Sequence, residues 1–187
     1  MTTRPVTVGS VTIGGGAPLV LIGGPCAIEN ERHALMTAER LAGIAADCRV
    51  PFIYKSSYDK ANRSSVNGYR GPGLIEGLRV LRKVRETLRV PVLSDVHQVS
   101  EVDPAAEVLD VIQIPAFLCR QTDLVLAAAA RIRSVCRQRN AGIWMTSSTS
   151  AAGSTSLTWW TSESTGTLKV SRTLRRMRSP STSPGPR

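Results

Sequence analysis

The amino-acid sequence predicts an α/β protein in which βα units build a parallel sheet. Two observations lead to this fold class. Short apolar runs alternate with longer stretches whose apolar residues recur at helical spacing. Each apolar run also ends in glycine, proline or polar residues, which are typical of the loop that follows a buried strand. Four such units are recognisable within residues 1–130.

The first unit begins with residues 18–24, which are continuously apolar and end in Gly-Gly before Pro25. This pattern predicts a buried strand. A helix is expected over residues 31–46, where apolar residues follow one another at spacings of three and four. Asn30 precedes it and is expected to be its N-cap.

The remaining three units follow the same alternation. Residues 73–88 form the clearest amphipathic segment, with leucines and Val84 on one face and basic residues on the other. Strands are predicted at residues 50–55, 92–96 and 111–114, and helices at residues 73–88, about 99–108 and 122–132.

Charge is divided unequally along the 187-residue chain, whose formal net charge is +10. Residues 131–187 contain ten Lys or Arg and one acidic residue, so residues 1–130 carry a net charge of only +1. We therefore treat residues 1–130 as the folded body and residues 131–187 as a Ser/Thr/Arg-rich tail, which we expect to be disordered. A nucleic-acid binder acting through this tail is a disfavoured alternative, because it would need aromatic residues on a folded basic face.

Other features limit the cellular setting. The four cysteines form no Cys-x-x-Cys pair, so reduced thiols are expected. No targeting segment is recognisable at the start, and no apolar run approaches the roughly 18 residues of a membrane span. We expect a cytoplasmic protein without a membrane partner.

Polar or reactive residues follow each predicted strand. Cys26 follows the first strand, Lys55 ends the second, Asp95 and His97 lie at the third, and Gln113 lies in the fourth. In parallel α/β folds the carboxyl ends of the strands meet at one edge, where active sites are built. Any one of these residues could simply mark the end of a strand, but four consecutive cases favour a functional site. We expect His97 to support this site and His33 to lie on the surface.

The loop of residues 55–73 is the segment richest in functional groups. Cations next to hydroxyl and amide donors form charge-assisted hydrogen bonds with phosphate or carboxylate. A solvated basic loop is the alternative, and it explains the amide and the serines less well. The residues concerned are Lys55, Lys60, Arg63, Arg70, Ser56, Ser57, Asn62, Ser64 and Ser65.

Five motifs together resemble the 3-deoxy-D-manno-octulosonate 8-phosphate synthase family. The resemblance covers residues 6–130. The motifs are Gly23-Gly24-Pro25-Cys26-Ala27-Ile28-Glu29, Tyr54-Lys55-Ser56-Ser57-Tyr58-Asp59-Lys60-Ala61-Asn62-Arg63-Ser64-Ser65, Tyr69-Arg70-Gly71-Pro72-Gly73, Ser94-Asp95-Val96-His97, and Ile112-Gln113-Ile114-Pro115-Ala116-Phe117-Leu118-Cys119-Arg120-Gln121-Thr122-Asp123-Leu124.

The resemblance implies a (β/α)8 TIM barrel that condenses phosphoenolpyruvate with D-arabinose 5-phosphate and releases phosphate, in lipopolysaccharide (Kdo) biosynthesis. Related 3-deoxy-arabino-heptulosonate 7-phosphate synthases use erythrose 4-phosphate and typically carry Lys-Pro-Arg-Thr-Ser at the position of Lys60-Ala61-Asn62-Arg63-Ser64. Asn62 therefore favours the octulosonate enzyme, with the heptulosonate enzyme as the alternative.

The resemblance also implies roles for residues in the loop after the second strand and at the end of the third strand. Lys60 is the catalytic candidate, since it would lie near both the phosphoenolpyruvate and the pentose aldehyde. Lys55 and Ser57 would bind substrate beside it. Asn62 and Asp95 would hold hydroxyl groups of the pentose.

Five further residues complete the candidate substrate site by resemblance. Arg63 and Ser64 would bind the phosphate of the pentose across a subunit interface of a homo-oligomer, a tetramer in the family. Gln113 and the backbone N–H of Ala116 would contribute to the phosphoenolpyruvate pocket, and Arg120 would lie on the phosphate side or at an interface.

Cys26 resembles the metal-dependent branch of the family, because the other branch carries Asn at this position. Its thiolate would help to bind a divalent metal such as iron, zinc or manganese. We assign Cys48, Cys119 and Cys136 to packing.

The chain departs from the family after residue 130. A barrel of this kind takes about 250 residues, and only four of its eight units are recognisable. We hypothesise a reading-frame change near residue 131, so that the chain could be inactive. Half a barrel would leave its first and fourth strands as unpaired edges.

Overall fold

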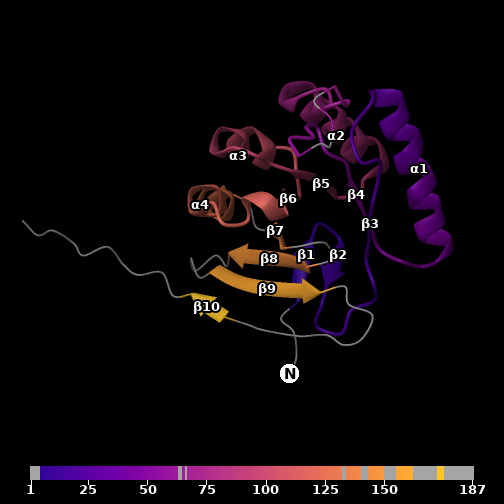
Figure 1. Cartoon of the computed structure of the whole chain (residues 1–187). Coiled ribbons are helices and arrows are strands. Elements are labelled where there is room, and N and C mark those ends of the chain that lie inside the picture. Colours follow the sequence, from indigo (N-terminus) through magenta and orange to yellow (C-terminus); the bar gives the residue numbers. More distant parts are fainter. Residues whose placement is uncertain are drawn as a thin grey trace, which may run out of the picture.

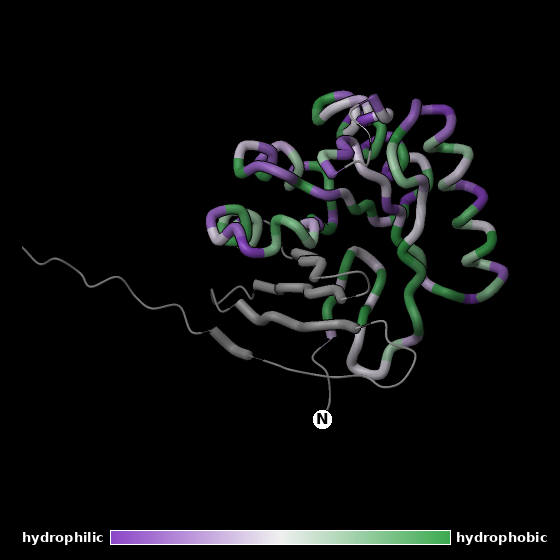
Figure 2. The backbone as a smooth tube through the Cα atoms, viewed as in Figure 1, coloured by the Kyte–Doolittle hydropathy of each residue, from purple (hydrophilic) through white to green (hydrophobic). Residues whose placement is uncertain are grey.

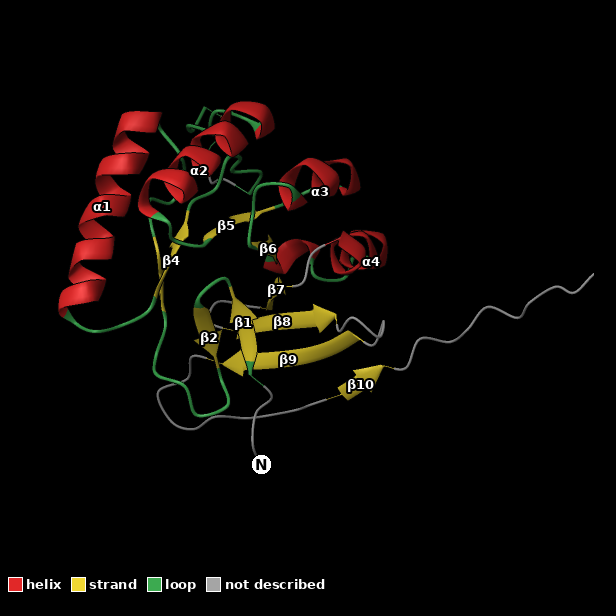
Figure 3. Ribbon diagram, turned by 180° about the vertical axis from the view of Figure 1, so that it is seen from behind, coloured by secondary structure: helices red, strands yellow, loops and turns green. Residues whose placement is uncertain are grey.

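The computed structural model describes residues 5–62, 65 and 67–131, together with the backbone of four strands after residue 133. One large sheet has the strand order β10-β9-β8-β7-β6-β5-β4-β3. The strands from β3 to β7 are parallel, and the later ones pair antiparallel. Helices α1 to α4 line one side of the parallel strands, and a separate two-stranded hairpin lies on the other side (Figures 1 and 3).

The predicted βα units are confirmed, with boundaries that differ by up to three residues. Asn30 caps the first helix through its side chain, which accepts a hydrogen bond from the backbone N–H of His33 at 2.8 Å. The strands are β3 (Leu21–Gly23), β4 (Phe52–Lys55), β5 (Val92–Asp95) and β6 (Val111–Ile114). The helices are α1 (Glu31–Asp47), α2 (Leu74–Leu88), α3 (Val99–Ala106) and α4 (Thr122–Arg131), with a short 3-10 turn, η1 (Ala116–Leu118), before α4.

Alternation along the strands separates two apolar clusters. Tyr54 and Ile112 face the helices and belong to the larger cluster. Ile53, Leu93 and Val111 point to the opposite face and belong to a smaller cluster. Successive side chains of a strand point to opposite faces, so both faces of this sheet are covered, as expected of parallel strands.

The smaller cluster is completed by an N-terminal hairpin that was not predicted. Its strands are β1 (Val6–Val8) and β2 (Val11–Ile13), joined through Gly9, whose φ is +55°. Val6, Val8 and Val11 are buried against the inner face of the sheet. Figure 2 shows the hairpin and the adjoining strands as largely apolar, whereas hydrophilic residues recur along the helices. The hairpin thus covers the end of the strands opposite to their carboxyl ends.

The structure differs from the expectation of a disordered tail at four segments. These are β7 (Ser134–Arg139), β8 (Ile143–Thr149), β9 (Thr155–Thr161) and β10 (Arg172–Leu174). We expected β6 to be an unpaired edge, but β7 pairs with it in parallel. β3, the other expected edge, does end the sheet of described strands. The backbone of β6 offers hydrogen-bonding groups to any adjacent segment, and Thr, Val and Trp favour strands. In the part of the chain that the structure describes, no helix is long and apolar enough to cross a membrane.

Two helical glycines provide a matched test of how α2 packs against Tyr58 in the loop after β4. A Cβ at Gly77 in α2 would overlap the Cβ of Tyr58, whereas a Cβ at Gly43 in α1 would meet no atom within 4 Å. We expect Gly43→Ala to stabilise the protein by about 0.5–1 kcal/mol through helix propensity. Gly77→Ala should instead destabilise it by about 1–3 kcal/mol, because Tyr58 must shift. Urea unfolding of both variants measures the two free energies, and a stabilised Gly77→Ala would contradict the packing described.

Candidate active site

Residues at the carboxyl ends of three adjacent strands face the same cavity. Lys55, Asp95 and Gln113 lie two positions after Ile53, Leu93 and Val111, so they point to the same side as this apolar layer. The parallel register of β5 and β6 places Asp95 beside Gln113. The cavity is about 360 Å³, and six predicted site residues line it: Lys55, Lys60, Asn62, Asp95, Gln113 and Ala116.

Two ammonium groups meet at one serine oxygen in this site. Lys55 Nζ donates to Ser57 Oγ at 2.7 Å, and Lys60 Nζ donates to the same oxygen at 2.9 Å. Burial lowers the pKa of Lys55, and the charge of Lys60 lowers it further, while Asp95 opposes the shift. Paired cations held in a partly buried cavity are suited to an anionic ligand.

Asp95 is the carboxylate that balances these cations. Its Oδ1 lies 3.5 Å from Lys55 Nζ, and its Oδ2 lies 3.3 Å from His97 Nε2. Burial alone would raise the pKa of Asp95, but hydrogen bonding with His97 and the charge of Lys55 hold it well below its ordinary value. Asp95 is therefore ionised at neutral pH and accepts hydrogen bonds.

The loop after β4 is tied to the loop after β3. Ser56 Oγ donates to the carbonyl of Pro25 at 2.8 Å, and the Tyr69 hydroxyl donates to the carbonyl of Ile28 at 2.9 Å. Gly24 lies so close to the Lys55 carbonyl that any Cβ there would overlap it. These contacts fix the direction in which the chain leaves β4, and hence the position of Ser57.

The second half of this loop is held by an ion pair. Arg70 contacts both oxygens of Asp59, at 2.6 and 2.9 Å. This hydrogen bonding lowers the pKa of Asp59. The backbone N–H of Lys60 donates to the Arg70 carbonyl at 2.7 Å, which joins the two ends of the loop beneath the cavity-lining Lys60.

The other predicted site residues have different positions. Ser57 is buried and holds the two lysines. Arg120 is exposed and does not line the cavity. Arg63 and Ser64 lie outside the described residues.

Three residues of the site were missed or given a smaller role. His97, expected only to support the site, lines the cavity itself. Tyr58 and Glu101 were not singled out, although the Tyr58 hydroxyl donates to Glu101 Oε2 at 2.8 Å. The spacing of His97 and Glu101, four residues apart at the start of a helix, is the one sequence signal that could have indicated their contact.

The cysteine proposed as a metal ligand is exposed at the start of the loop after β3. Among the described residues, no group of three or more His, Cys, Asp or Glu could hold a metal ion. Cys26 therefore does not form a complete metal site with the residues described.

A sequence model described as the DAHP synthetase I family matches residues 3–174. The chain belongs to this family. The match includes every strand and helix described above, and also the cavity.

Curated relatives point to one branch of the DAHP synthetase I family. The chain is 64% identical over 126 residues to a protein of Geotalea daltonii, covering 67% of this chain and 46% of that protein. It is 62% identical over 127 residues to a protein of Trichlorobacter lovleyi (68% and 47%). It is 59% identical over 133 residues to one of Geobacter sulfurreducens (71% and 49%). All three are named 2-dehydro-3-deoxyphosphooctonate aldolase, and the chain spans about half their length.

Removal of the central carboxylate tests this site without substrate. We expect Asp95→Asn to destabilise the protein by about 3 kcal/mol at pH 7, because it leaves the partly buried Lys55 without an acidic partner and removes one of the two carboxylates beside His97. The folded pKa of Asp95 lies below its ordinary value, so its contribution is present above about pH 4 and is lost as pH falls through the folded pKa.

The matched control is Asp103→Asn, because Asp103 pairs with Arg131 at 2.8 Å on the surface. It should change the free energy of unfolding by no more than about 1 kcal/mol. Urea unfolding at pH 7 and at pH 3 compares the variants. Equal effects of the two substitutions at pH 7 would contradict the role of Asp95.

Proposed function

We propose that this chain binds phosphoenolpyruvate and D-arabinose 5-phosphate and condenses them to 3-deoxy-D-manno-octulosonate 8-phosphate and phosphate. It would thus be a transferase of lipopolysaccharide core sugar synthesis. The observation that carries this proposal is the pair of ammonium groups on Ser57, beside the ionised Asp95, in one cavity. The name of the curated relatives, 2-dehydro-3-deoxyphosphooctonate aldolase, supports the same reaction.

The charges in the cavity suit two anionic substrates. Lys55 and Lys60 would bind the phosphate and carboxylate of phosphoenolpyruvate, which would otherwise repel the sugar phosphate. Asp95 accepts hydrogen bonds and Asn62 lines the same cavity, so both suit the hydroxyl groups of a pentose. Gln113 and Ala116 lie on the β6 side of the cavity, where the enolpyruvate would rest.

The reaction forms one carbon–carbon bond. The enol carbon of phosphoenolpyruvate attacks the aldehyde carbon, whose oxygen takes up a proton and becomes a hydroxyl. Water adds to the neighbouring carbon, the bond from that carbon to the phosphate oxygen breaks, and inorganic phosphate leaves. Lys60 would stabilise the negative charge that develops on the aldehyde oxygen.

The heptulosonate reaction is the alternative within the family, and Asn62 together with the names of the relatives disfavours it. Assembly into a homo-oligomer, the binding of a divalent metal through Cys26 and a cytoplasmic location remain predictions from the resemblance. Nucleic acid remains a disfavoured partner, because the basic excess belongs to residues 131–187.

An assay with two aldoses separates the alternatives. We expect the full chain to release phosphate from phosphoenolpyruvate in the presence of arabinose 5-phosphate, and to do so much more slowly with erythrose 4-phosphate. ³¹P NMR measures both rates of phosphate release. The opposite preference would assign the heptulosonate reaction, and no release with either aldose would refute the activity for this chain.

A lysine substitution tests the role of the cavity. Lys60→Met should lower kcat/KM by about 100-fold or more, because a fixed charge at the reacting oxygen is lost. Lys83→Met, which makes the same change on the exposed face of α2, should leave kcat/KM unchanged. Equal rates for the two variants in the phosphate-release assay would remove Lys60 from the mechanism.

A further inference from the structure

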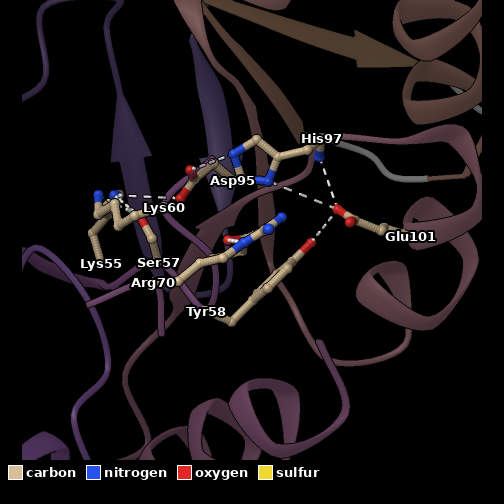
Figure 4. Close-up of polar contacts among 9 residues, drawn as sticks. Lys55, Ser57, Tyr58, Lys60, Arg70, Asp95, His97 and Glu101 are labelled. Carbon is tan, nitrogen blue, oxygen red and sulfur yellow. Dashed lines mark hydrogen bonds and ion pairs between the residues drawn. The ribbon is translucent and has the colours of Figure 1, made fainter. Parts of the chain in front are cut away.

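We propose that Glu101, held by Tyr58, is a positioning residue that keeps the His97 ring doubly protonated, and that His97 in turn keeps the Asp95 carboxylate ionised and directed at Lys55. The role of Asp95 towards a pentose rests on the proposed function. The protonation state of His97 does not, because it follows from contacts within the chain. Figure 4 shows the five side chains in a row from Lys55 to Tyr58.

Glu101 is fixed from two directions. It lies in the first turn of α3, with 13% of its side chain exposed. Its Oε2 accepts hydrogen bonds from the backbone N–H of His97 and from the Tyr58 hydroxyl, both at 2.8 Å. Burial and the charge of Glu101 raise the pKa of Tyr58, so the phenol stays protonated and remains a donor. The carboxylate therefore has a defined place beside His97.

The His97 ring lies between two carboxylates. Its Nε2 is 3.3 Å from Asp95 Oδ2, and its Nδ1 is 3.9 Å from Glu101 Oε2, an ion-pair distance. Only 7% of the side chain is exposed. A neutral imidazole carries one donor and one acceptor, so either tautomer would turn a lone pair towards a carboxylate. The imidazolium turns an N–H towards both.

The wider surroundings of His97 also favour the cation. Asp95 on β5, Glu101 on α3 and Asp59 in the loop after β4 all attract its charge, and together they raise the pKa of His97 although burial alone would lower it. Among the cations nearby, Lys55 pairs with Asp95 and Arg70 with Asp59, while Lys60 donates to Ser57. The ring of Phe117 stacks on the His97 ring with centroids 6.2 Å apart, which limits its rotation.

Charges therefore alternate along the row from Lys55 through Asp95 and His97 to Glu101. Each oxygen of Asp95 faces one cation, Oδ1 towards Lys55 and Oδ2 towards His97. Asp95 lines the cavity, and as an ionised carboxylate it remains an acceptor for a ligand there. Glu101 and Tyr58 are absent from the cavity lining and would act only through His97.

The chain has two histidines, His33 and His97, which makes the test direct. In ¹⁵N-histidine-labelled full chain, long-range ¹H–¹⁵N spectra report the protonation of each ring nitrogen, and His33→Asn assigns the signals. We expect His97 to be doubly protonated at pH 7. A neutral His97 at pH 7 would overturn the proposal.

The decisive variant is Glu101→Gln, because the amide oxygen can still accept from His97 and Tyr58 while the charge is lost. We expect the titration midpoint of His97 to fall by roughly one pH unit or more. Glu107→Gln, which removes an exposed charge at the other end of α3, should leave the midpoint unchanged. Equal midpoints in the two variants would refute the role of Glu101.

Further variants separate charge from folding and from the activity. Tyr58→Phe keeps the Glu101 charge and removes its donor, so the His97 midpoint should fall by less than about one pH unit from that of the unaltered chain, and this test does not depend on whether Glu101→Gln folds. A larger fall in Tyr58→Phe would contradict a role exerted through the Glu101 charge. In the phosphate-release assay, Glu101→Gln should raise the KM for arabinose 5-phosphate several-fold more than the KM for phosphoenolpyruvate. A chain that releases no phosphate but retains the His97 titration would refute the proposed function alone.

Discussion

The buried carboxylate of Asp95 is the group on which the arrangement of the cavity depends. It joins β5 to β4 through Lys55 and to the start of α3 through His97 and its neighbour Glu101. Without it, Lys55 would remain partly buried without an acidic partner, and His97 would keep only Glu101 as an ion-pair partner. Its position is itself a consequence of strand geometry, because alternation in β5 places Leu93 in the apolar layer and Asp95 above it.

Much of the fold was predictable because the signals are local. The helices α1 and α2 have regular apolar faces, and β4, β5 and β6 each begin with at least two apolar residues after a proline or an acidic residue, so the sequence pattern locates them to within a few residues. The hairpin of β1 and β2 was missed because strands of three residues carry too little pattern to be distinguished from loop. The strands after residue 133 were missed for another reason, since β7 depends on backbone pairing with β6 rather than on a periodic pattern, and β8, β9 and β10 each pair with the strand before them.

The candidate site, like the fold, has a part that was predictable from the sequence and a part that was not. The strand-end positions of Lys55, Asp95 and Gln113 could be inferred from the chain, because parallel strands bring their carboxyl ends together. The roles of Lys60 and Asn62 came from the family resemblance, and the structure places both at the cavity. The contact between Tyr58 and Glu101 joins residues 43 positions apart, and no local pattern encodes it. It depends on how α3 packs beside the loop after β4.

The N-terminal hairpin has a consequence for the electrostatics of the cavity. Val6, Val8 and Val11 cover the apolar layer formed by Ile53, Leu93 and Val111, directly beneath the layer that carries the charged groups. Water is thereby kept from the lower side of Lys55 and Asp95, so their attraction acts through a medium of lower dielectric constant than a cleft open at both ends would provide. The packing of three valine side chains, which are remote in sequence from every ionisable residue of the site, thus helps to determine how strongly those ionisable residues interact.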